Sequence, residues 1–161
     1  ESIQIFITEN KMIIEYDTTT FEIRSIHYGM VYNASDWSGY NVAGQAIAKS
    51  ESDLDCHNKY AIIAEDGITF TTGNLNTYSI SISKTQISAN DTDYCDFTNV
   101  PEGTTLYLDD TSSGTMDASG ILRFKATEAG IYMIAFVKEH YARLTMSVHA
   151  NDGYLYDNIT G

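Results

Sequence analysis

The sequence predicts an all-β protein with a small β-rich N-terminal domain followed by a β-sandwich. Strand-forming residues are abundant, since the 161 residues include 12 Tyr and 6 Phe together with many Ile, Val and Thr. From residue 78 onward, short segments alternate between apolar and polar residues, and turn residues separate them at the spacing expected of a sandwich. In this part of the chain no apolar pattern of helical period and length competes with the alternation. Composition, alternation and turn spacing therefore all indicate an all-β fold.

The N-terminal domain is expected to span residues 1–73. Asp66-Gly67 is a strong signal for a hairpin with a two-residue turn. The expected elements are strands at 3–8, 12–17, 21–26, 60–63 and 68–71 and a short, weak helical stretch at 42–53. Residues 72–76, Thr-Gly-Asn-Leu-Asn, are the expected linker because the chain becomes more regular after them.

The second domain is expected to span residues 78–150. Its expected strands are 78–83, 92–98, 104–109, 114–117, 121–126, 130–137 and 143–149. On one of them Cys95 and Phe97 face one way and Asp96 the other. Alternation with charges on one face is typical of antiparallel strands that bury one side. Residues 151–161 follow as a C-terminal tail, which is expected to dock on a neighbouring subunit because it would fray alone.

One motif makes the sandwich prediction more specific. The segment Glu128-Ala-Gly-Ile-Tyr132-Met-Ile134 resembles the acid-x-Gly-x-Tyr-x-Cys segment of immunoglobulin domains, whose tyrosine forms a tyrosine corner. The resemblance implies an immunoglobulin-like β-sandwich. In it, Gly130 would permit a tight turn, and Tyr132 would bury its ring and donate its hydroxyl to an upstream backbone group. Ile134 stands where antibody domains place the second disulfide cysteine, so an antibody-type domain is not expected.

A longer run resembles the C-terminal Ig-like module of small accessory proteins encoded among the tail and virion genes of tailed bacteriophages. The matching segments are 89–94 (Ala-Asn-Asp-Thr-Asp-Tyr), Val100-Pro101, 106–110 and 124–132, so the resemblance covers less than half of the chain. It implies a non-enzymatic structural component of a virion, made in the host cytoplasm and bound in many copies to other virion proteins. Tail or baseplate accessory protein and capsid decoration protein are both open, and the tail is slightly favoured.

Aromatic residues in polar segments are the candidate contacts with a partner. Trp37 lies with Tyr32 and Tyr40 in one polar stretch, and Tyr154 and Tyr156 lie in the C-terminal tail. Large rings bury much area at low entropic cost, which favours contact with proteins or sugars. Two alternatives stay open. Trp37 packs inside the N-terminal core, or the chain is an extracellular bacterial surface or glycan-binding adhesion module.

The sequence contains no recognisable catalytic constellation, so neither an enzyme nor a cofactor is expected. The 4 His residues are widely spaced, and none lies in an HxH, HxxH or HExxH motif. Cys56-His57 invites a reactive interpretation, but its neighbours Asp53 and Asp55 would raise rather than lower the thiol pKa. The enzyme alternative is a metal-assisted hydrolase that uses His57 and nearby acids.

Several acidic residues in predicted loops could bind a metal ion or simply form turns. The acidic residues in question are Asp91, Asp93, Asp96, Asp109, Asp110 and Asp117. They could line a Ca²⁺ site, but no EF-hand spacing occurs and Asp is an ordinary turn residue, so no metal site is predicted.

Cys95 is expected to act as a small core hydrophobe. Reduced thiols are favoured over a Cys56–Cys95 disulfide, which would cross the domain boundary.

The net charge of −13 excludes two classes of partner. With 22 acids against 9 bases, the surface repels phosphates and anionic lipid, so neither nucleic acid nor a membrane is expected to bind.

No apolar run approaches the roughly 20 residues that a membrane helix needs. Residues 1–8 show no signal peptide, although a leader removed by processing stays open.

Overall fold

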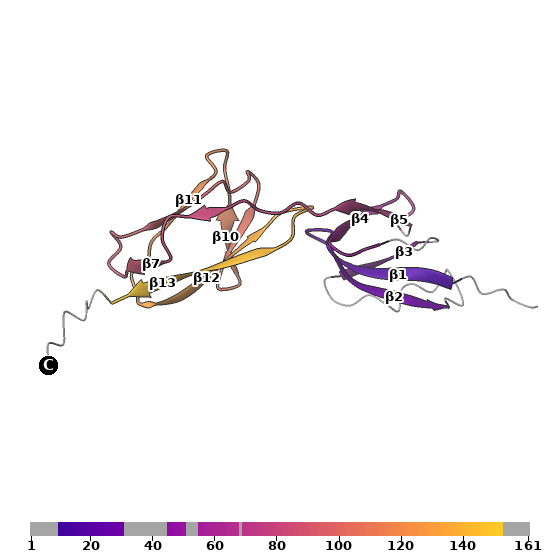
Figure 1. Cartoon of the computed structure of the whole chain (residues 1–161), viewed down its shortest axis with the longest axis horizontal. Helices are drawn as coiled ribbons and strands as arrows, with labels where there is room; N and C mark the ends of the chain where they lie inside the picture. Colours follow the sequence, from indigo (N-terminus) through magenta and orange to yellow (C-terminus); the bar gives the residue numbers. More distant parts are fainter. Residues whose placement is uncertain (1–9, 31–44, 51–54, 68, 153–161) are drawn as a thin grey trace, which may run out of the picture. The chain divides into compact units, whose positions relative to one another are not determined.

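The computed structural model consists of β-strands and connecting segments, with no helix in the residues that it describes (Figure 1). The described residues are 10–30, 45–50, 55–67 and 69–152, with side chains described for 14–26, 55–67 and 69–152. The all-β prediction is therefore confirmed for these residues. The chain divides into two compact units. The first unit contains residues 1–76 and 139–142, and the second contains residues 77–138 and 143–161.

The first unit contains an antiparallel sheet of three strands in the order β2-β1-β3. The strands are β1 (Asn10–Asp17), β2 (Ile23–Met30) and β3 (Gln45–Ser50). The β1–β2 turn is fixed by Asp17, whose Oδ1 accepts hydrogen bonds from the backbone amides of Thr19 and Thr20 at 2.9 and 3.0 Å. A short acceptor side chain that bonds the backbone two or three residues later is the reason Asp favours turns.

A second hairpin completes the described part of the first unit. It pairs β4 (Lys59–Ile63) with β5 (Phe70–Asn74). The hairpin is where the sequence predicts it, but the turn is longer than two residues, since Ile63 and Phe70 form the last strand pair. Gly67 takes φ +69°, a conformation that glycine adopts without strain. The buried hydrophobic residues described in this unit come from both sheets and the segment before β4: Ile14, Tyr16, Cys56, Ala61 and Phe70.

Two further sequence predictions for this unit are wrong. The stretch 42–53 is predicted to be weakly helical, but Gln45–Ser50 forms β3 and pairs with β1 along its whole length. A neighbouring strand supplies backbone hydrogen bonds that so short a helix could not sustain by itself. The predicted linker 72–76 begins inside β5, so its first three residues are paired with β4. The predicted strand at 3–8 lies outside the described residues.

The second unit contains two sheets that share one core (Figure 1). One is five-stranded, in the order β10-β9-β12-β13-β7, and the other is three-stranded, in the order β11-β8-β6. The strands are β6 (Ser81–Ile82), β7 (Gln86–Ser88), β8 (Cys95–Thr98), β9 (Thr105–Leu108), β10 (Thr111–Thr115), β11 (Ile121–Phe124), β12 (Gly130–Val137) and β13 (Leu144–Asn151). Neighbouring strands are antiparallel except β13 and β7, which are parallel.

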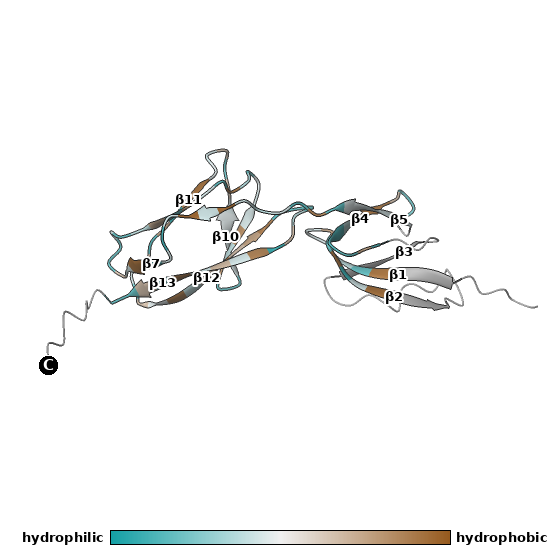
Figure 2. Ribbon diagram, in the orientation of Figure 1, coloured by the Kyte–Doolittle hydropathy of each residue, from teal (hydrophilic) through white to brown (hydrophobic). Residues whose placement is uncertain are grey.

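The predicted alternation is present in this unit. Cys95 and Phe97 are fully buried on β8, whereas Asp96 between them is partly exposed. Phe97 meets Phe136 of the other sheet with ring centroids 5.6 Å apart, so the two inner faces pack on each other. Short hydrophobic stretches on the strands alternate with hydrophilic turns in Figure 2. The strand predicted at 78–83 is shorter than expected, and the sequence does not predict β7, because three residues are too few to show a period.

Among the described residues, no helix has the length and apolar character needed to cross a membrane.

Candidate functional sites

Tyr132 forms the contact that its motif implies. Its hydroxyl donates a hydrogen bond of 2.9 Å to the backbone carbonyl of Glu128, four residues upstream. Its ring is partly buried and packs on Phe124, with centroids 5.2 Å apart. This arrangement ties the start of β12 to the segment before it. The contact is structural, because it joins a side-chain hydroxyl to a backbone carbonyl.

Gly130 does not serve the purpose that the sequence suggests. It is the exposed first residue of β12, and its φ is not in the left-handed region. A Cβ added there would meet only Cε2 of Tyr132, at 3.8 Å, which is ordinary contact. Gly130 therefore supplies no left-handed conformation to the bend before β12, and its backbone conformation is one that other residues also adopt.

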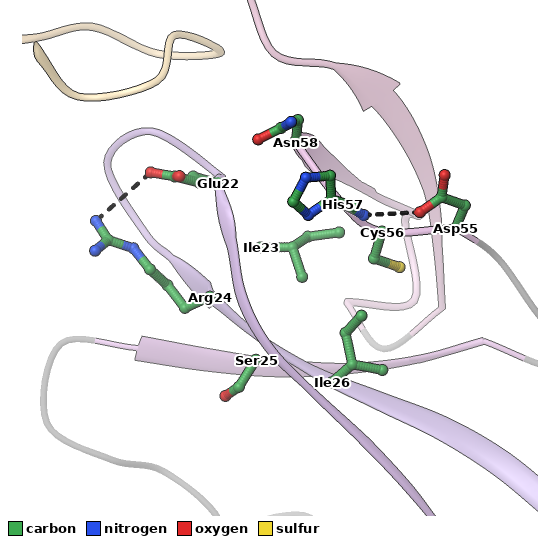
Figure 3. Close-up of a pocket in the computed structure, with 9 residues that line it drawn as sticks. All are labelled: Glu22, Ile23, Arg24, Ser25, Ile26, Asp55, Cys56, His57 and Asn58. Carbon is green, nitrogen blue, oxygen red and sulfur yellow. Dashed lines mark hydrogen bonds and ion pairs between the residues drawn. The ribbon is translucent and has the colours of Figure 1, made fainter.

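One pocket of about 420 Å³ lies in the first unit (Figure 3). Its walls come from the start of β2 and from the segment that leads into β4. The lining residues are Glu22, Ile23, Arg24, Ser25, Ile26, Asp55, Cys56, His57 and Asn58. Arg24 is held by Asp17 at 3.0 Å and by Glu22 at 3.8 Å, so its charge is already compensated. The pocket combines an apolar wall with polar groups that are largely engaged within the chain.

The Cys56-His57 pair in this pocket lacks the features of a nucleophilic site. Cys56 is 3% exposed, and burial followed by the charge of Asp55 raises the pKa of its thiol. The thiol form is a weak nucleophile. The backbone amide of His57 donates to Asp55 Oδ1 at 3.0 Å, so this carboxylate shapes the local turn. Within the described ranges, no three His, Cys, Asp or Glu side chains gather in a way that could hold a metal ion.

Most of the acidic residues considered for Ca²⁺ are engaged separately. Asp93 pairs with Lys84 and accepts from the amide of Ser88, and Asp96 pairs with Arg123. The remaining contacts are Asp109 Oδ1 with the amide of Met133, Asp110 with Arg143, and Asp117 with Ser119. These bonds use the carboxylates to fix turns and strand faces. Hydrogen bonds to Lys84 and Arg123 are the largest causes that lower the pKa values of Asp93 and Asp96.

The outer face of the three-stranded sheet carries a charged aromatic cluster that sequence reasoning missed. Arg123 on β11 donates two hydrogen bonds to Asp96 on β8, at 2.8 and 2.9 Å, and its guanidinium lies 3.8 Å from the ring centre of Tyr94. Alternation predicts that each faces outward, but only the pairing of Arg123 with Asp96 in register brings them together. The cluster is a cross-strand ion pair with a cation–π contact.

The candidate partner contacts Tyr32, Trp37, Tyr40, Tyr154 and Tyr156 lie outside the described residues. Cys56 and Cys95 form no disulfide, and both are buried, one in each unit. His149 is exposed on β13, as the alternation of that strand predicts.

Comparisons with protein-family models, with curated proteins and with solved structures found no match for this chain.

Proposed function

We propose that the second unit is an immunoglobulin-like sandwich and that the protein is a non-enzymatic structural component of a tailed-phage virion. The fold part is supported by strand order. If β8, β9, β11, β12 and β13 are the immunoglobulin strands B, C, E, F and G, the two sheets correspond to E-B and C-F-G with additional edge strands. The Tyr132–Glu128 hydrogen bond then falls where the tyrosine corner of strand F is expected. The fold part of the proposal rests on the Tyr132–Glu128 hydrogen bond together with this strand order.

The same alignment gives Cys95 and Ile134 a joint meaning. Cys95 lies on the strand corresponding to B, and Ile134 stands two residues after Tyr132 on the strand corresponding to F. Immunoglobulin domains of antibodies join these positions by a disulfide. Both side chains are buried in one core, where Ile134 is 3% exposed and Cys95 0%. The sandwich therefore keeps one cysteine position and fills the other with an aliphatic residue.

An engineered disulfide tests this fold assignment. Ile134→Cys, combined with Cys56→Ser to remove the other thiol, is expected to oxidise so that Cys95 and the introduced cysteine form a bridge within the monomer. Mass spectrometry would detect the loss of two hydrogens and the linked peptides. Cys56→Ser alone is the control and keeps one free thiol. Two titratable thiols after oxidation of the double variant would argue against the B–F pairing, because a bridge needs Cα atoms about 4.4–6.8 Å apart.

The virion part of the proposal rests on the resemblance of residues 89–132 to phage accessory modules. Among the described residues, Arg24, Lys84, Arg123 and Arg143 each pair with a carboxylate of the same chain, as expected of groups with a structural role. A protein of this kind acts by burying surface against neighbouring subunits, without changing any bond. Tail or baseplate accessory protein and capsid decoration protein are both compatible with it, and we favour the tail.

Incorporation into particles tests the virion role. Particles assembled without this protein are mixed with the purified full chain, separated by density and examined for bound protein by mass spectrometry and electron microscopy. Saturable binding at symmetric positions on the tail or capsid is the expected result. Trp37→Ala and the pair Tyr154→Ala and Tyr156→Ala report whether the predicted contacts carry the binding. Absence of saturable binding, or binding of host glycans that Trp37→Ala abolishes, would overturn the virion role.

A further inference from the structure

Residues 139–142 connect β12 to β13 in the sequence, yet they group with the first unit. We propose that this segment, which we call the clasp, is required to complete the first unit and is dispensable for the second. The inference goes beyond the proposed virion role and does not depend on it. It makes the first unit a composite of two chain segments, and His140 of the second lies 64 positions after Asn76 of the first.

The backbone of the clasp is bonded on both sides of His140. The amide of His140 donates to the carbonyl of Thr20 at 2.9 Å, and its carbonyl accepts from the backbone amide and side-chain amide of Asn76, at 2.8 and 3.2 Å. The amide of Ala142 donates to the carbonyl of Asn76 at 3.1 Å, beside a parallel bridge between Asn76 and Tyr141. Thr20 is 1% exposed, so water cannot readily replace its carbonyl as the acceptor, whereas Asn76 lies in an exposed position.

The side chain of His140 continues a row of aromatic rings. Its imidazole stacks on Tyr60, with ring centroids 3.8 Å apart and planes 13° apart, and it meets Phe21 edge-on at 5.9 Å. Phe21 in turn stacks on Tyr16 at 5.9 Å. The row therefore contains a ring from β1, one from the turn after it, one from β4 and one from the clasp. Such pairs add to the stabilisation that comes from burial alone.

A glycine on β5 makes room for this row. Gly73 is the strand partner of Tyr60, and a Cβ added to Gly73 would lie 2.3 Å from Cζ of Tyr60. The Tyr60 ring therefore lies directly against the backbone of β5 while it contacts His140. The position that resembles a linker in the sequence is in fact where a ring that contacts the clasp packs against a strand. This explains why glycine occupies it.

Two backbone conformations at this site are kept in place by their contacts. His140 has φ +62° and Phe21 has φ +60°, in the left-handed region that bulky side chains avoid. Phe21 is held by its amide on the Asp17 carbonyl at 2.7 Å and by its own carbonyl, which accepts from the amide of Ala61 at 2.8 Å. Strained residues of this kind persist only where the surrounding structure determines them. The backbone of Phe21 is thus held by bonds within residues 17–61, and that of His140 by its bonds to Thr20 and Asn76.

Hydrogen exchange of the full chain, read by mass spectrometry, tests the clasp. In His140→Ala, peptides covering 59–63 and 70–74 are expected to exchange about tenfold faster, because a stacked and partly buried ring is lost. Peptides covering 95–98 and 130–137 are expected to exchange as in the unchanged protein. His140→Gly removes the ring but keeps the left-handed backbone, so it isolates the stacking and is expected to give the same pattern with a smaller increase. His149→Ala, at an exposed histidine of the second unit, is the matched control.

Each other outcome counts against the clasp. Exchange of 59–63 and 70–74 within twofold of the unchanged protein in both His140 variants would overturn it. An effect confined to His140→Ala would assign the change to backbone strain and overturn the role of the ring. Equal acceleration in both units would show that the segment is needed by the whole chain. Protection that falls on dilution, with a dimer in solution, would mean that the segment is supplied by a second copy.

Discussion

The two units close their cores in different ways. In the second unit two sheets face each other, and Phe97 and Phe136 meet between them at 5.6 Å, so alternate residues along the strands contribute to the core. In the first unit the partly buried Phe21 packs against the core and also contacts His140 of the clasp. A core that forms by regular alternation along several strands contains many residues with equivalent roles. The contacts of the first unit with a distant segment depend on a few specific residues, and these are the contacts to test.

The largest expected effect is in the second core. Phe136→Ala removes a ring that is 0% exposed, and we expect it to lower the free energy of unfolding of this unit by about 3–5 kcal/mol. Urea denaturation followed by hydrogen exchange of peptides covering 130–137 and 59–63 would separate the units. Met133→Ala, at a 44% exposed position on the same strand, should change stability by less than about 0.5 kcal/mol. Comparable losses in the two variants would contradict the burial pattern.

The next effect distinguishes two glycines. Gly73→Ala places a methyl group 2.3 Å from a ring atom of Tyr60, and we expect it to destabilise the first unit by about 1–3 kcal/mol. Gly130→Ala meets nothing closer than 3.8 Å and should be neutral or slightly stabilising, because alanine restricts the unfolded chain.

A double-mutant cycle checks the cause of the first loss. In a Tyr60→Ala background, Gly73→Ala should cost clearly less than in the unchanged protein, since the clashing ring is gone. Thermal unfolding of the four proteins is sufficient for the measurement. Additive losses would mean that Gly73 matters for a reason other than the Tyr60 ring.

A smaller effect concerns the bond at the start of β12. Tyr132→Phe removes the hydroxyl that donates to the carbonyl of Glu128, and the expected loss is about 1 kcal/mol in the second unit. The ring packing on Phe124 is kept, so the fold should not change. Tyr94→Phe, whose ring lies under Arg123, is a control expected to stay within about 0.5 kcal/mol. If Tyr132→Phe left the stability of the second unit unchanged, the hydrogen bond to Glu128 would not be a stabilising contact.

The smallest effect is a dependence on pH. Burial tends to raise the pKa of Asp17, but hydrogen bonding to the Thr20 amide and the charge of Arg24 contribute to a net lowering. Hydrogen bonding from Arg123 lowers the pKa of Asp96. A folded-state pKa below the unfolded value stabilises the protein above about pH 4, and this contribution is lost as pH falls through the folded pKa. Denaturation midpoints between pH 3 and 6 should therefore fall on acidification, less steeply for the first unit in Asp17→Asn and for the second in Asp96→Asn.

Local pattern determined the second unit to a large extent. Alternation at Cys95 and Phe97 placed them inside, and the segment around Tyr132 predicted a hydroxyl bonded to the backbone upstream. These features depend on neighbours within a strand or a turn, where side-chain direction follows directly from sequence position. The reason assigned to Gly130 was wrong, because a glycine in a motif does not reveal its own φ.

Contacts distant in the sequence determined the rest. Residues 45–50 became a strand because β1 offers an unpaired edge, and 72–74 became part of β5 by pairing with β4, where Gly73 leaves room for the Tyr60 ring. Residues 139–142 joined the first unit through bonds to Thr20 and Asn76 that no local pattern encodes. The amino-acid sequence by itself determined which residues alternate inward in the sandwich. Only the tertiary structure decided which segments meet, because pairing and ring stacking depend on register and on positions far apart in the chain.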